Sequence, residues 1–279
     1  MFRLIDIELH KLRNSRASKV LIIAYFTLLT SIALIAAIKF DIGPIEFHLA
    51  EQGIFNFPFI WHFNTFIAAF FKIFLLLVIV SMMANEYSNK TLKQNLIDGL
   101  SKKEFVLSKF YTVMLFAFIS TLFVFIVSLV LGLIYSDYNE ISIILTDPEY
   151  LLAFFVKLMG FFSFGLFLGV LIKRSAFAVG AMIIWFFAET IAYNYFKYNR
   201  LFEDTNIADS VFQFAPLKSM WNLIDEPFSR LNAVRTLANQ IGENLDVDYG
   251  VHWYEIAIVL GWTFLFIYGT FRLLKYRDL

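Results

Sequence analysis

The chain contains no cysteine, and this absence excludes disulfide bonds, thiol nucleophiles and cysteine-ligated metal sites. Charged residues are also scarce: they make up 16 % of the 279 residues, whereas soluble domains contain about 25 %. Apolar residues account for 59 % of the chain and include 35 phenylalanines. This composition is typical of a polytopic membrane protein, and the length predicts a single membrane unit.

Three motifs of enzymes are absent as well. The chain has no G-x-x-x-x-G-K-[ST] loop for nucleotide hydrolysis, no H-E-x-x-H zinc site and no G-x-S-x-G nucleophile turn. The histidines are dispersed and lack the spacing of metal ligands; they are His10, His48, His62 and His252. Basic residues form no patch with interleaved aromatics. We therefore expect no catalytic residue, no metal or other cofactor in this chain, and no nucleic-acid partner.

Six apolar runs reach the length of about 20 residues that a helix needs to cross a bilayer. They cover residues 20–40, 60–84, 105–135, 150–172, 176–196 and 253–274. Residues 1–19 lack the apolar core and the cleavage site of a signal peptide. The sequence therefore predicts an all-α polytopic membrane protein with six transmembrane helices, which form one domain over residues 1–279.

Basic residues predict the orientation, because short cytoplasmic loops are rich in Lys and Arg. Fifteen Lys and Arg lie in the N-terminal arm, the segment 85–109, the turn at 173–174 and the C-terminal tail. On the other side the loops 41–59 and 136–149 contain none, and the longer region 197–252 contains five. We expect both termini to be cytoplasmic and residues 197–252 to be external.

The two ends of this topology have features of their own. In the arm 1–19 an apolar helical face recurs, formed by Phe2, Ile5, Leu9 and Leu12. This predicts an interfacial helix that lies among lipid headgroups and is free to touch a cytoplasmic partner as well. In the external region, residues 229–241 predict an amphipathic helix, and residues 214–221 a short helix or re-entrant turn. That region is either a solvated cap or a lid over a pathway.

Residues 85–109 form the longest polar, charged segment among the first 130 residues, and residues 85–104 of it connect two predicted spans. Three leucines recur in it at four-residue spacing: Leu92, Leu96 and Leu100. This spacing predicts an amphipathic helix over residues 86–97, which Gly99 would end. Ser101 and Glu104 form an S-x-x-E capping box for the following helix. The segment is interpreted as a docking helix for a soluble partner, and the alternative is a solvated loop.

Three charged residues fall within the apolar runs, where charge is costly and often functional: Lys72, Lys157 and Glu189. At about 1.5 Å rise per residue, Glu189 lies at nearly the depth of both lysines. We expect Glu189 to pair with one of them; a substrate contact in a central cavity and snorkelling are the alternatives. Gly165 and Gly169 form a G-x-x-x-G pattern that permits close helix packing, within the subunit or across a dimer.

These features together resemble the membrane subunit of ABC-2-type bacterial ABC transporters. In that family a span ends in an E-x-x-x-x-T block, followed by a helix, a polar turn that begins S-[KR], and a lysine that enters the next span. Glu86 and Thr91 match the block, Ser101 and Lys102 match the turn, and Lys109 matches the entering lysine. Among the branches of the family, the permeases related to bacitracin and lantibiotic-immunity exporters are the most similar.

The resemblance implies a half-transporter whose motor is a separate chain. A second permease chain, identical or related, would pair with this one in the bacterial inner membrane, and two ATPase chains, which hold ATP and Mg²⁺, would dock on the cytoplasmic side. The implied ATPase-coupling residues are Glu86, Thr91, Leu92, Leu96, Leu100, Ser101 and Lys102. An amphipathic or lipid-like substrate, or a peptide, would be exported past Lys72, Lys157 and Glu189. We expect no enzymatic activity in this chain itself.

Two other classes of function remain open. One is a non-transporting membrane scaffold for a motility or secretion machine, since a fold alone does not fix a function. The other is a secondary transporter or channel, against which the lack of a visible internal repeat argues. Co-purification of an ATPase subunit would favour the ABC transporter.

Overall fold

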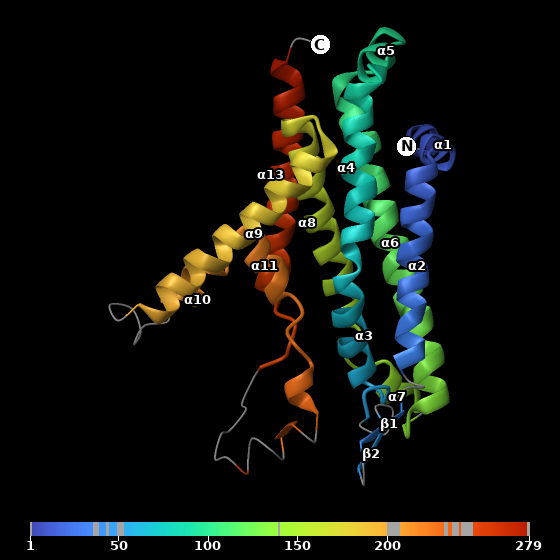
Figure 1. Ribbon diagram of the computed structural model, residues 1–279, viewed down its shortest axis with the longest axis vertical. Coiled ribbons are helices and arrows are strands. Elements are labelled where there is room, and N and C mark those ends of the chain that lie inside the picture. Colours follow the sequence, from blue (N-terminus) through green and yellow to red (C-terminus); the bar gives the residue numbers. More distant parts are fainter. Residues whose placement is uncertain are drawn as a thin grey trace.

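The computed structural model describes residues 2–35, 39–42, 45–48, 53–138, 140–199, 207–231, 234–235, 240 and 248–277. Long helices run side by side along the long axis of the molecule (Figure 1). They are α2 (Arg16–Ile35), α3 (Phe59–Phe70), α4 (Lys72–Ser88), α6 (Lys102–Tyr135), α8 (Glu149–Ile172) and α13 (Trp253–Tyr276). A seventh long helix, α9 (Ser175–Tyr198), leaves the bundle at an angle (Figure 1). The fold is thus predominantly helical, as expected.

Short elements lie at the two ends of the bundle. The end that contains both termini also holds α1 (Phe2–Asn14) and α5 (Thr91–Ile97), and the opposite end holds α7 (Ile141–Ile144) and the strands β1 (Lys39–Ile42) and β2 (Ile45–His48) (Figure 1). Beside α9 lie α10 (Ile207–Phe212) and α11 (Pro216–Asn222), and the 3₁₀ helix η2 (Phe228–Arg230) follows along the chain.

By length and composition, four described helices can cross a membrane, or up to six if each of two bent helix pairs counts as one span. The first pair joins α1 to α2 through a bend of 94°, so α1 lies across the end of the bundle as an interfacial helix would. The second pair joins α3 to α4 through a bend of 45°. The predicted run 60–84 is therefore divided into two helices, and no Gly or Pro in the sequence marks the break at Phe71.

The prediction that the first span extends to residue 40 is wrong. Helix α2 stops at Ile35, and Lys39–Ile42 pairs with Ile45–His48 as a two-stranded antiparallel hairpin. Alternating apolar residues on either side of Gly43-Pro44 are a recognisable hairpin signal, and the apolar run alone conceals it.

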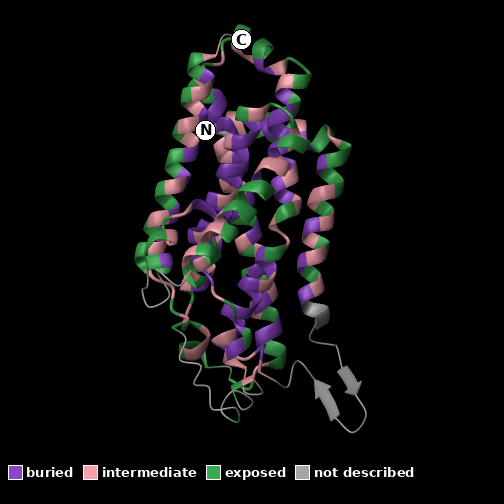
Figure 2. Cartoon of the chain, turned by 60° about the vertical axis from the view of Figure 1, so that its left-hand side comes forward, coloured by how far each residue is buried: buried purple, intermediate pink, exposed green. Residues whose placement is uncertain are grey.

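Helix α8 is the central element, in contact with α3, α4, α6, α9, α11 and α13. Buried residues are concentrated along it and along the facing sides of its neighbours, whereas α9 buries only Ala178 and Met182 (Figure 2). Gly165 and Gly169 lie where α8 meets α4: a Cβ on Gly165 would clash with Leu76, and one on Gly169 would approach Met83 Cβ to 3.2 Å. The glycine pattern therefore serves close packing within the subunit.

In the region 197–252 the proline-led segment is helical, as α11 with Pro216 at its first turn. The helix expected over residues 229–241 lies largely outside the described residues; of its start, Ser229 and Arg230 belong to η2.

Candidate functional site

The connection between α4 and α6 forms a compact elbow, which we define as residues 85–104. The prediction of one helix over 86–97 is wrong, because Lys90 adopts a left-handed conformation (φ 57°) that separates α4 from α5. The carboxylate of Glu86 explains the fold-back, since it accepts hydrogen bonds from Thr91 Oγ1 at 2.6 Å and from Asn95 Nδ2 at 3.4 Å. Farther along, Gly99 has φ 96°, which suits a residue without Cβ.

The start of α6 is capped as the sequence predicts. Ser101 Oγ accepts from the backbone N–H of Glu104 at 3.1 Å, and the Glu104 carboxylate accepts from the N–H of Ser101 at 2.9 Å. The neighbouring Lys102 links the elbow to another helix, because its Nζ donates to the backbone oxygen of Arg277 at 3.1 Å. The elbow is thus attached to the C-terminal end of α13.

A buried cluster of four charges joins the elbow to α1. Lys109 Nζ lies 2.5 Å from Glu86 Oε1 and 2.6 Å from Glu8 Oε2, and all three side chains are almost fully buried. Lys11 completes the cluster, with Nζ 2.7 Å from Glu86 Oε1 and 3.5 Å from Glu8 Oε1. Two acids and two bases balance, as buried charges require. The cluster holds α1, α4, α5 and α6 together.

The roles expected for Glu86 and Thr91 change accordingly. Glu86 is 3 % exposed, so its side chain offers little surface to a partner and instead positions α5. Glu8 is not among the residues that the sequence pattern singles out, although it lies between Ile5 and Leu12 at helical spacing, on the apolar face of α1. A lone acid on an apolar face, with Lys11 three residues on, is the signal that could have revealed it.

The leucine face of the elbow packs onto this chain itself. Leu92 is 3 % exposed, and Leu96 and Leu100 are partly buried against the core. The surface that α5 leaves free is formed by other residues, namely Lys93, Gln94, Ile97 and Asp98. Ile97 is 75 % exposed, which makes it the prominent apolar side chain of this surface.

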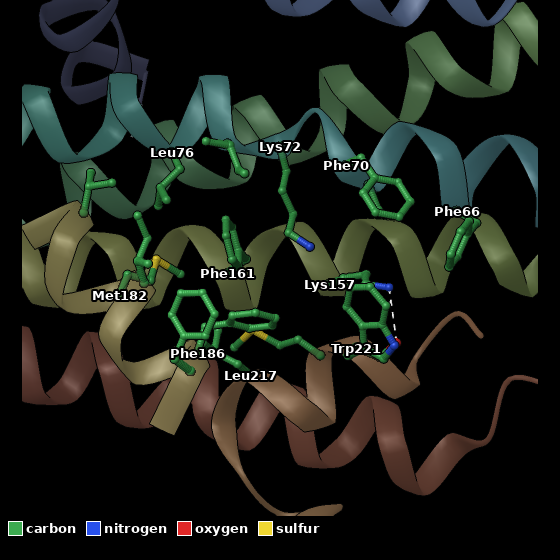
Figure 3. A pocket seen from close by; sticks show the side chains of 16 residues that line it. Phe66, Phe70, Lys72, Leu76, Lys157, Phe161, Met182, Phe186, Leu217 and Trp221 are labelled. Atoms are coloured by element: carbon green, nitrogen blue, oxygen red, sulfur yellow. Dashed lines mark hydrogen bonds between the residues drawn. The ribbon is translucent and has the colours of Figure 1, made fainter. Parts of the chain in front are cut away.

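A second candidate site is a cavity of about 330 Å³ in the membrane part, between α3, α4, α8, α9 and α11 (Figure 3). Its walls are mostly aromatic and aliphatic, and they include Phe66, Phe161, Phe186, Leu217, Met220 and Trp221. Its two charged lining residues are Lys72, from the start of α4, and Lys157, from α8. A neighbouring cavity of about 270 Å³ shares Phe186, Leu217 and Trp221 and reaches Glu189 and Lys218.

The expected ion pair of Glu189 with Lys72 or Lys157 does not form. Lys157 is 2 % exposed; its Nζ donates to the backbone oxygen of Trp221 at 3.3 Å and lies 5.8 Å from the centre of the Trp221 ring. Lys72 Nζ lies 4.6 Å from the centre of the Phe161 ring. In the described part of the chain, no carboxylate oxygen comes within 4.0 Å of either ammonium group. Equal depth along two helices did not bring the side chains together, because α9 diverges from α8 (Figure 1).

Glu189 instead binds the N-terminus of α11. Its carboxylate accepts from the backbone N–H groups of Leu217 (3.0 Å) and Lys218 (2.9 Å), and from Trp185 Nε1 at 2.5 Å. These N–H groups have no partner within their own helix, so the carboxylate satisfies them as hydrogen-bond acceptor. The helix dipole also favours a negative charge at this end. Lys157 binds the other end of the same helix, at Trp221. Glu189 and Lys157, which the sequence suggested as an ion pair, therefore bind opposite ends of α11.

A third polar network closes the opposite end of the bundle from the elbow. His62 is fully buried and stacks on Tyr150 with ring centres 4.4 Å apart. Arg230 Nη1 lies 3.1 Å from His62 Nδ1, and His62 Nε2 lies 2.9 Å from the backbone oxygen of Asp225. Because arginine can only donate, Nδ1 accepts and Nε2–H donates. His62 thus connects η2 and its flanking loop to α3.

The comparisons with known proteins agree with this architecture. A search of curated proteins gives no match. A family model described as "ABC-2 family transporter protein" matches residues 6–279, which is nearly the whole chain and includes the elbow and the cavity. The chain belongs to the ABC-2 family and is a permease subunit of an ABC transporter.

Proposed function

We propose that this permease exports an amphipathic or lipid-like substrate, or a peptide, and that separate ATPase chains drive it. Two permease chains, identical or related, would form the transporter in the bacterial inner membrane, with two ATPase chains on the cytoplasmic side. The observation that carries the proposal is the elbow: a short helix with a free outer surface, fastened through buried Glu86 and Lys109 to α4 and α6.

The chain's own contacts support force transmission from the elbow. A push on α5 passes through Thr91 to Glu86 at the end of α4, and α4 runs on to Lys72 at the wall of the cavity. The same push reaches α13 through the bond between Lys102 and Arg277. ATP and Mg²⁺ would be bound by the partner chain, and this chain would supply position and movement alone.

Both termini and the elbow are proposed to be cytoplasmic. The positive-inside distribution supports this orientation, and so do the contacts that gather α1, α5 and the end of α13 at one end of the bundle: Glu8 with Lys109, and Lys102 with Arg277. The proposed export depends on a separate ATPase, whereas neither a scaffold nor a secondary transporter would require one.

The test is a substitution on the free surface of α5. Ile97→Asp places a charge where an apolar anchor would enter a cleft on the ATPase, and the loss of one anchor of this kind typically costs more than about 1–2 kcal/mol. We expect reduced capture of the ATPase by the tagged permease and a loss of ATPase stimulation in the reconstituted complex. Ile141→Asp is the matched control, because Ile141 is 74 % exposed at the opposite end of the bundle. Equal ATPase capture by the two variants would contradict the proposal.

A further inference from the structure

The membrane cavity contains two lysine side chains, Lys72 and Lys157, and in the described chain no carboxylate oxygen lies within 4.0 Å of either ammonium group. An ammonium group has three N–H donors. The ammonium group of Lys157 donates one hydrogen bond to the carbonyl oxygen of Trp221 and lies over the Trp221 ring. In the described chain, the ammonium group of Lys72 contacts only the face of the Phe161 ring. Charges at this depth are costly unless a counter-charge is near. The cavity therefore has the electrostatic character of an anion site.

The rest of the cavity favours an apolar ligand. Apart from the two lysines, its lining side chains are hydrocarbon, aromatic or thioether groups. Its rim includes Phe70, Ile73, Ile183 and Phe187, each more than half exposed on the outer surface of the helices. In a bilayer such a surface faces acyl chains. A molecule that fits both features has an anionic group at one end and a hydrocarbon tail at the other.

We propose that the cavity between α3, α4, α8, α9 and α11 binds the phosphate or carboxylate group of a lipid-class amphiphile between Lys72 and Lys157. Lys72 contacts the anion directly, because it has no hydrogen-bond acceptor of its own in the described chain. Lys157 adds a second positive charge from its place beside Trp221. The tail leaves past Phe70 and Ile73 into the bilayer. This inference rests on the proposed export function, and it narrows the substrate to an anionic amphiphile.

The cavity volume agrees with this assignment. About 330 Å³ is near the lower limit of small-molecule sites, which suits a headgroup whose tail stays outside. The adjoining cavity, at about 270 Å³, extends the space past Trp221 toward Lys218. Trp221 stands at the junction of the two, so a bound headgroup meets the indole as well as the lysines.

The experiment measures lipid binding to the permease alone, without any ATPase. Purified protein in mild detergent is titrated with phosphatidylglycerol or with phosphatidylcholine of the same acyl chains, and bound lipid is counted by native mass spectrometry. We expect the anionic lipid to bind at least tenfold more tightly. Lys72→Gln and Lys72→Met remove this preference, Lys72→Arg keeps it, and the exposed Lys275→Gln leaves it unchanged.

Two results would overturn the inference. One is equal binding of the two lipids, and the other is equal preference in Lys72→Gln and Lys275→Gln. Soluble glycerol 1-phosphate identifies the source of the anion: if it binds as tightly as the lipid with the same dependence on Lys72, the site is one for free anions and the lipid assignment fails. Because no ATPase is present, these results are independent of whether Ile97→Asp uncouples the transporter.

Discussion

Glu189 and Lys157 stand at opposite ends of one short helix, the carboxylate at the N–H groups of its first turn and the ammonium at the carbonyl of Trp221. Each sign faces the end of α11 that the helix dipole favours. The helix has seven residues, too few to be stable alone, so its place depends on these contacts and on its packing against α8, α9 and α13. Glu189 and Lys157 thus hold α11 in place from its two ends, a role that a direct ion pair between them would not have.

Removal of the Glu189 charge should release α11. Glu189→Gln keeps the side-chain shape but weakens two backbone hydrogen bonds to a charged acceptor, each worth about 1.5–3 kcal/mol. We expect a lower unfolding midpoint in detergent and faster proteolysis next to α11. Glu140→Gln, on an exposed loop, is the matched control. Rescue of Glu189→Gln by Lys157→Met or Lys72→Met would show that an ion pair, and not the helix cap, had been broken.

The buried cluster at the elbow gives a second prediction. Lys109→Met leaves Lys11 as the remaining cation of the cluster beside both Glu8 and Glu86, and breaking a buried pair costs about 3–5 kcal/mol. We expect a large loss of folded yield and of stability in detergent denaturation. Lys103→Met, at an exposed position of the same helix, should change stability by no more than about 0.5 kcal/mol. Similar behaviour of the two variants would mean that the cluster contributes little.

Helix packing gives a third prediction. Gly165→Ala places a methyl group against Leu76 on α4, and overpacking of this kind costs about 1–3 kcal/mol. Gly180→Ala is the matched control in α9, because no heavy atom lies within 4 Å of its added Cβ. We expect destabilisation for the first variant and a neutral or slightly stabilising effect for the second, measured by thermal unfolding. A neutral Gly165→Ala would indicate that α4 and α8 are less tightly packed than described.

The topology can be tested with two isosteric substitutions, which the cysteine-free sequence makes simple. Ser88→Cys lies at the end of α4, and Ser210→Cys lies in α10; both positions are exposed. With an impermeant maleimide on intact cells, we expect labelling of Ser210→Cys alone. Both should react after the membrane is permeabilised. The opposite pattern on intact cells would reverse the proposed orientation.

The parts that the sequence predicts well are those that depend on local pattern. Apolar runs predicted the long helices from α6 onward to within three residues at each end, because length and hydropathy decide them. The capping box at Ser101 and the turn at Gly99 were also found, since each depends on neighbours within a few residues.

Three of the misses share one physical origin, contact between distant segments. The break at Phe71, the partners of Glu189 and the burial of Glu8 follow from which helices meet and at what angle. Depth counted along a helix does not supply that angle. The leucine face of α5, which the family resemblance assigned to ATPase coupling, packs against the core for the same reason.

The left-handed residue between α8 and α9 has a mechanical consequence. Lys173, with φ 65°, joins a helix locked to α4 through Gly165 to a helix that buries only two residues. A swing about this joint carries α11 along, because Glu189 fastens that helix to α9. The same swing stretches the bond between Lys157 and Trp221, which links α11 back to the fixed side. That bond, together with the packing of α11 against α8 and α13, opposes such a movement of α9 about Lys173.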